Sequence, residues 1–164
     1  MPSLTDIDPD GLLEYSVVFS DRSLNHMSQT FQQVMREISE NLRNVYNGEG
    51  VALVPGGGTF GMEAVARQFG TGKKCLVIRN GWFSYRWSQI FEAGSIPSEE
   101  VVVKARPTVP VEEAAYIPPP IEEVVRLIEK TSPDVVFAPH VETSSGMILS
   151  DDYLKEVAAA TNSI

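Results

Sequence analysis

Apolar residues recur at intervals of three and four along residues 23–47, which is the spacing of an amphipathic helix with one buried face. Asn47 and Gly48 follow this pattern, and both residue types tolerate the left-handed backbone that ends a helix. Residues 1–22 mix aspartate, proline and glycine with apolar residues and show no sustained period. We therefore expect an N-terminal arm over residues 1–22 and a long helix from Ser23 to Asn47.

Beyond the long helix, short apolar runs alternate with helical patterns as far as residue 160. Strands that are apolar throughout and separated by helices are typical of a parallel sheet covered on both faces. The pattern predicts an α/β fold for residues 23–164, with a three-layer, mostly parallel sheet and helices on both faces. The predicted strands are 51–54, 75–78, 100–103 and 135–138, the predicted helices are 59–69, 83–93, 121–130 and 151–160, and residues 106–120 form a proline-rich loop.

The sequence stops after a predicted helix, at Ile164, where an alternating sheet protein should continue with a strand. We therefore expect the 164 residues to be a truncated N-terminal part of a larger domain. An open sheet edge would favour poor solubility or association of the isolated chain.

Composition restricts the class of protein. With 43% apolar residues the chain can form a core, and a net charge of −9 without a basic run disfavours nucleic acid as a partner. No apolar stretch reaches the roughly 18–20 residues of a membrane span, and the N-terminus lacks the order of a signal peptide. A single cysteine, Cys75, favours a reducing, cytoplasmic location, and with two histidines it provides no metal-ligand spacing.

A glycine-rich segment, Pro55–Gly61, lies between a predicted strand and a predicted helix. Glycines let the backbone approach a ligand closely, and the N–H groups at the start of a helix bind phosphate. Thr59 could cap this helix and also offer its hydroxyl to the phosphate. The alternative is a tight strand-to-helix turn with a threonine cap and no ligand.

The spacing of Gly56, Gly58 and Gly61 also fits a dinucleotide-binding fingerprint. That interpretation expects an acidic residue near the end of the second strand, to bind a ribose. Arg79 and Asn80 stand there instead, so this alternative is an NADP-binding Rossmann-type domain in which Arg79 accepts the 2′-phosphate.

Two further clusters follow the second and fourth predicted strands, at the strand ends where α/β sheets bind ligands. Residues 79–87 carry four aromatic side chains, and an exposed one could stack on a flat heterocycle. We expect Trp87 to join the core. Tyr85 could either join the core or stack on a ligand. Residues 139–146 carry hydroxyls that could bind a cofactor or a carboxylate. His140 is expected to be a buried, hydrogen-bonded histidine, and a triad with Glu142 and Ser144 is too close in sequence to converge easily.

These three motifs resemble, in order and approximate spacing, those of the class V aminotransferases among the fold-type I pyridoxal-phosphate enzymes. The resemblance runs from about Arg22 to the end of the sequence. Its strongest parts are Gly57-Gly58-Thr59 with Glu63-Ala64, then Asn80-Gly81-Trp82-Phe83-Ser84-Tyr85-Arg86, and His140-Val141-Glu142-Thr143-Ser144-Ser145-Gly146. This group includes alanine–glyoxylate, serine–pyruvate and phosphoserine aminotransferases.

The resemblance implies a pyridoxal 5′-phosphate site and a transaminase that uses an amino acid and a 2-oxo acid, as a homodimer when full length. Phe83 would stack on the pyridine ring, or Trp82 if the loop is shifted by one residue, and Thr143 would lie near the phenolic oxygen. The phosphate would bind Gly57, Gly58 and Thr59, and Glu142 and His140 would shape the third loop.

The family's Schiff-base lysine and the aspartate that faces the pyridine nitrogen would both lie beyond Ile164. The 164 residues therefore contain no catalytic residue by this resemblance and should not transaminate alone. A third possibility is a truncated, non-catalytic binding module.

Overall fold

The computed structural model describes residues 26–161, which fall into two compact units divided between Leu53 and Val54. Each unit is described by itself. None of the helices in residues 26–161 is long and apolar enough to span a bilayer.

The first unit contains one long helix, α2 (Gln29–Tyr46). Ser28 is its N-cap and accepts a hydrogen bond from the N–H of Phe31 at 3.1 Å, while Asn47 ends it with a left-handed φ of 49°. The long helix predicted from the apolar spacing is confirmed from Gln29 to its end. Its predicted start at Ser23, and the predicted arm, lie outside the described residues.

The strand predicted at residues 51–54 is wrong. This segment carries no strand, and Leu53 and Val54 are exposed. A short run of β-prone residues becomes a strand only where a neighbouring strand pairs with its backbone. No such partner lies beside this segment in residues 26–161, because the main sheet consists of β1 (Lys74–Arg79), β2 (Glu99–Lys104) and β5 (Val135–Phe137).

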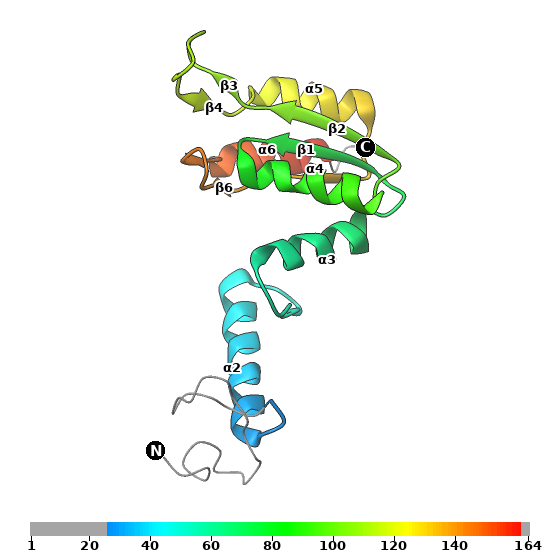
Figure 1. Ribbon diagram of the computed structural model, residues 1–164, viewed down its shortest axis with the longest axis vertical. Coiled ribbons are helices and arrows are strands. Elements are labelled where there is room, and N and C mark those ends of the chain that lie inside the picture. The colour runs from blue at the N-terminus through cyan, green and yellow to red at the C-terminus, as the bar shows by residue number, and fades with distance from the viewer. Residues whose placement is uncertain (1–25, 162–164) are drawn as a thin grey trace. The chain divides into compact units, whose positions relative to one another are not determined.

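The second unit contains the other predicted elements, as Figure 1 shows. Two short hairpins were not predicted. The first, β3 (Arg106–Pro107) with β4 (Tyr116–Ile117), lies within the predicted loop 106–120, and the second, β6 (Val141–Glu142) with β7 (Met147–Ile148), begins in the polar segment 139–146 and ends just after it. The elements are α3 (Gly58–Gly70), β1 (Lys74–Arg79), α4 (Trp82–Gly94), β2 (Glu99–Lys104), β3 (Arg106–Pro107), β4 (Tyr116–Ile117), α5 (Ile121–Thr131), β5 (Val135–Phe137), β6 (Val141–Glu142), β7 (Met147–Ile148) and α6 (Asp151–Thr161).

The main sheet is parallel and has the strand order β2-β1-β5. Val77 in the central strand pairs with Val102 on one side and with Phe137 on the other. Each strand is joined to the next in sequence by a segment that contains a helix, as parallel pairing requires. The predicted α/β class is confirmed.

Strand β1 separates two apolar cores, because its side chains alternate between the two faces of the sheet. Cys75 and Val77 are buried on the face covered by α3 and α4, and burial raises the pKa of the Cys75 thiol to about 11. Leu76 and Ile78 are buried on the opposite face, which α5 and α6 cover. This arrangement is the predicted three-layer architecture. Trp87 joins the core beneath α3 and α4, as predicted, and its ring centroid lies 4.5 Å from that of Phe137.

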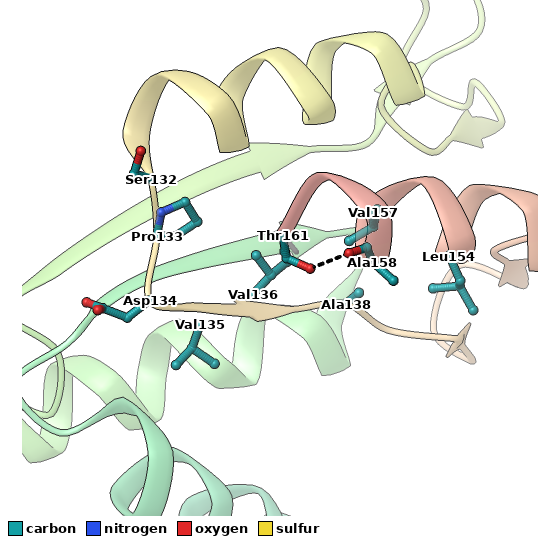
Figure 2. A pocket seen from close by; sticks show the side chains of 10 residues that line it. All are labelled: Ser132, Pro133, Asp134, Val135, Val136, Ala138, Leu154, Val157, Ala158 and Thr161. Carbon is teal, nitrogen blue, oxygen red and sulfur yellow. Dashed lines mark hydrogen bonds between the residues drawn. The ribbon is translucent and has the colours of Figure 1, made fainter. Parts of the chain in front are cut away.

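A groove lies beside β5, the last strand in the order β2-β1-β5, and between this strand and α6 (Figure 2). Val136 and Ala138 line it from the strand side, and Leu154 and Ala158 line it from the helix. Strand β5 pairs with β1 on one edge only within residues 26–161, so its other edge faces this groove.

We expect the 164-residue chain to self-associate at high concentration, because an unpaired strand edge beside apolar side chains favours pairing with a second copy. Ala158→Glu introduces a charge into the groove at an exposed helical position, so it should weaken association at little cost to folding. Sedimentation velocity over a range of concentrations measures the effect.

Ala159→Glu is the matched control, since this neighbouring helical residue is also exposed but does not line the groove. It should leave association unchanged. An equal loss of association in both variants would show that added charge, and not the groove, controls self-association.

Candidate functional site

The second and third sequence clusters meet at the carboxyl edge of the sheet. Asn80 and Gly81 connect the end of β1 to α4, and the β6–β7 hairpin follows β5, the strand beside β1. Their meeting follows from the parallel order of the strands, whose carboxyl ends share one edge.

The hairpin satisfies the three backbone N–H groups that begin α4. The N–H of Trp82 donates to the Ser144 hydroxyl at 2.7 Å, and those of Phe83 and Ser84 donate to the two carboxylate oxygens of Glu142 at 3.0 and 2.7 Å. The first N–H groups of a helix have no partner within the helix. Here a segment about 60 residues further along the chain supplies all three acceptors, with separations of 62, 59 and 58 residues.

Glu142 is only 1% exposed and accepts two further hydrogen bonds, from the hydroxyls of Ser84 and Ser144, each at 2.6 Å. Burial alone would raise the pKa of this carboxyl, but the four hydrogen bonds outweigh it and the pKa lies below its ordinary value. The buried side chain is therefore a carboxylate held as an anion at the positive end of α4.

Gly81 allows the hairpin to approach the start of α4. A Cβ atom at this position would lie 2.5 Å from the Ser144 hydroxyl oxygen and 2.7 Å from Cγ of Glu142. No side chain larger than hydrogen fits between these groups. The Ser84 hydroxyl completes the junction by accepting from the N–H groups of Asn80 and Gly81.

A pocket of about 420 Å³ opens beside this junction. Trp82, which is 55% exposed, lines it together with Ser144, and Lys104 and Tyr116 complete its charged and aromatic lining. Tyr85 lies outside the core: its ring is 5.7 Å from that of Trp82, and the Arg79 guanidinium lies 4.7 Å from its centre.

The glycine-rich segment begins α3, and its helix start differs from the predicted one. Gly57 is the N-cap and makes no side-chain cap, so the predicted capping role of Thr59, the second residue of the helix, is wrong. Thr59 lines a separate cavity of about 300 Å³ between α3 and α4, together with Arg86 and Gln89. The structure thus joins Trp82 to the hairpin that carries Thr143, and places Gly57 to Thr59 at another helix start.

The dinucleotide interpretation lacks its structural setting. The fingerprint requires a strand immediately before the glycines, and residues 51–54 form none. Gly56 has a φ of +120°, and a Cβ there would lie 2.0 Å from the Phe60 ring, so close packing inside the turn explains this glycine. Arg79, the predicted ligand of a 2′-phosphate, instead bonds to Ser88 and pairs with Glu100.

The third loop differs from expectation at His140. The side chain was expected to be buried but is exposed, while its backbone carbonyl accepts from the N–H of Leu149 at 2.9 Å. The Ser144 hydroxyl lies against Glu142, so these two residues serve the start of α4. Residues 26–161 contain no group of three or more histidine, cysteine or acidic side chains that could hold a metal ion.

Glu142 holds the start of α4, a role that the sequence analysis missed. There, the family resemblance assigned it only a part in shaping the third loop. The signal was present as an acidic residue among hydroxyls after a strand. Its four hydrogen bonds connect it to residues close to it only in the folded chain, apart from the bond with Ser144.

No family model and no curated protein match this sequence. Solved structures do. Ureidoglycine–glyoxylate aminotransferase from Bacillus subtilis matches with a TM-score of 0.63 at 20% identity, over 84% of this chain and 34% of that one. Alanine–glyoxylate aminotransferase from Nostoc sp. matches with a TM-score of 0.64 at 23% identity, over 84% and 35%. The chain has their fold.

A pyridoxal-5′-phosphate-dependent protein from Escherichia coli matches with a TM-score of 0.54 at 17% identity, over 78% of this chain and 32% of that one. These three structures are two aminotransferases and another pyridoxal-phosphate-dependent protein, the kind of enzyme that the sequence motifs predicted. The chain spans about a third of the length of each.

We expect Gly81→Ala to destabilise the second unit by about 1–3 kcal/mol, because the added methyl group would overlap Ser144 and Glu142. Gly61→Ala is the matched control, since a Cβ at this helical position meets nothing within 4 Å and should be neutral or stabilise by up to about 1 kcal/mol. Urea unfolding followed by circular dichroism compares the variants. Equal stability of the two alanine variants would contradict the close packing at Gly81.

The lowered pKa of Glu142 predicts a pH dependence of folding stability. Its contribution is complete above the unfolded carboxyl pKa of about 4.3 and is lost as the pH falls through the lower folded value. Urea unfolding from pH 7 to pH 3 should therefore show a loss of stability at acid pH that is smaller in Glu142→Gln. Glu92→Gln, an exposed change in the last turn of α4, should retain the wild-type profile.

Proposed function

We propose that this chain is the pyridoxal 5′-phosphate-binding part of a class V aminotransferase. The whole protein would transfer an amino group from an amino acid to a 2-oxo acid, of the alanine or serine and glyoxylate or pyruvate type. The observation that carries the proposal is the pocket at the carboxyl edge of the sheet, where the exposed Trp82 ring meets a hairpin rich in hydroxyls. The likeness in fold to aminotransferases supports the same function.

The start of α3 fits a phosphate group. Gly57 caps the helix without a side chain, and a Cβ on Gly57 or Gly58 would meet nothing within 4 Å, so an anion can approach the first N–H groups of the helix. The Thr59 hydroxyl adds a donor in the first turn. We assign the phosphate to Gly57, Gly58 and Thr59 on these grounds.

The start of α4 fits an aromatic ring. Trp82 and Phe83 are 55% and 51% exposed, and Thr143 is exposed in the β6–β7 turn beside Ser144. An exposed aromatic face at this edge can stack on a flat heterocycle. We assign ring stacking to Trp82 or Phe83, with Trp82 favoured because it lines the pocket, and contact with the phenolic oxygen to Thr143.

The bound cofactor would supply the electron sink for the reaction at the amino acid carbon. The residues of this chain would bind and orient it, the α3 start holding the phosphate and the α4 start holding the ring. We assign no catalytic residue to this sequence. The lysine and the aspartate that would complete the chemistry belong to the proposed whole protein.

We further propose that the whole protein is a homodimer in a reducing compartment such as the cytoplasm. Helix α2 supports the homodimer, because Val34, Ile38 and Val45 are exposed on this helix and would be covered by packing on a second subunit. Cys75 supports the reducing compartment, since it is the one cysteine of the sequence and is buried as a free thiol.

The test uses 4-deoxypyridoxine 5′-phosphate, a cofactor analogue without the aldehyde that would react with surface lysines, and its counterpart without the phosphate. Thr59→Ala should weaken binding of the phosphorylated analogue about tenfold and leave the other unchanged, because it removes only a phosphate contact. Trp82→Ala should weaken binding of both, because it removes a ring contact. Isothermal titration calorimetry measures the affinity of the wild type and of both variants for each analogue.

Thr71→Ala, at the other end of α3, is the control and should not alter either affinity. Binding of NADP⁺ without binding of the phosphorylated analogue would overturn the proposal in favour of the dinucleotide alternative. The same loss of affinity for both analogues in Thr59→Ala would overturn the assignment of the phosphate.

A further inference from the structure

Two helix starts in the second unit differ in whether they can receive an external anion. The start of α3 has no side-chain cap, whereas at α4 the three N–H groups of Trp82, Phe83 and Ser84 already donate to the β6–β7 hairpin. Two of these three bonds end on the Glu142 carboxylate, which is itself an anion. A ligand phosphate has no unoccupied donors at α4 and would meet a like charge there.

The same carboxylate controls the backbone that carries the exposed ring. Trp82 is the first residue of α4, and its N–H bonds to Ser144, whose hydroxyl lies 2.6 Å from Glu142. Phe83 and Ser84, the next two residues, bond to Glu142 directly. The backbone that carries the Trp82 ring is therefore held by the β6–β7 hairpin, by Ser144 at Trp82 and by Glu142 at the next two residues.

We propose that Glu142 is a positioning residue for the ligand: it occupies the N-terminal anion site of α4 and thereby holds Trp82 as a ring-binding surface without a phosphate. The phosphate of the same ligand is directed to α3. This inference rests on the proposed function, and it assigns the two helix starts to the two ends of a phosphorylated aromatic ligand.

The chemistry of the pocket agrees with this division. Trp82 and Tyr116 offer aromatic surface, Ser144 and Ser145 offer hydroxyls, and Lys104 offers a positive charge. A flat ring with polar substituents is the class of ligand that such a lining accepts.

The positioning requires both carboxylate oxygens of Glu142, because each accepts one backbone N–H of α4. Glutamine has nearly the same shape, but its amide group has one acceptor oxygen in place of two. Glu142→Gln therefore leaves at least one of the N–H groups of Phe83 and Ser84 without its acceptor. We expect the start of α4 to loosen while the cores on both sides of β1, which Glu142 does not join, remain folded.

The experiment follows tryptophan fluorescence while 4-deoxypyridoxine 5′-phosphate is added to the wild type, Glu142→Gln, Ser144→Ala and Glu92→Gln. Trp82→Phe assigns the signal to Trp82, since Trp87 is packed in the core against Phe137. We expect about tenfold weaker binding in Glu142→Gln, together with a changed emission maximum of Trp82 before any ligand is added. Ser144→Ala, which removes the acceptor of the Trp82 N–H and one of the four hydrogen-bond donors to Glu142, should show a smaller change in the same direction.

Glu92→Gln makes the same change of charge on an exposed part of α4 and should bind as the wild type does. Thermal unfolding confirms that each variant is folded, and Ser144→Ala provides the test if Glu142→Gln does not fold. One outcome is that the wild type binds the analogue while Glu142→Gln and Ser144→Ala keep its affinity and its emission maximum. That result would overturn the positioning role and leave the proposed function intact. Absence of analogue binding by the wild type would overturn the proposed function, and this inference with it.

Discussion

The site depends on a buried carboxylate at the start of a helix. Glu142 is 1% exposed, so its charge would be costly without partners, and four hydrogen bonds together with the positive end of α4 offset that cost. Through these bonds the loop after β5 is fastened to the junction of β1 and α4. Gly81 makes the contact possible, because any side chain there would occupy the space of the carboxylate.

The sheet brings these two loops together in the first place. Strand β1 lies between β2 and β5 and fills a separate core on each face, so its end is held firmly in the centre of the unit. Parallel pairing then places the ends of β1, β2 and β5 along one edge, and residues that follow β1 and β2, together with the hairpin after β5, line the pocket. The site is thus a consequence of strand direction as much as of the residues in it.

Fold and function rest on different observations in this protein. The likeness to aminotransferases at 20–23% identity establishes the arrangement of helices and strands. A fold of this kind supports many activities, so the function has to be argued from the side chains at the site. The start of α3 has no side-chain cap, and we propose that it binds the phosphate. The N–H groups at the start of α4 already donate to Glu142, and we propose that this helix start binds the ring.

The sequence by itself determined the helices α3, α4, α5 and α6, the strands β1, β2 and β5 of the parallel sheet and the order of the three motifs, because apolar spacing and helix ends are local properties of the chain. It misplaced a strand at residues 51–54, since pairing partners cannot be seen in a run of apolar residues, and it missed two short hairpins for the same reason. Only the tertiary structure decided the contact of Glu142 with Phe83 and Ser84, 59 and 58 residues apart in sequence. The hydrogen bonds of this buried carboxylate can form only when the strands that carry the two loops are aligned, and no local sequence pattern specifies them.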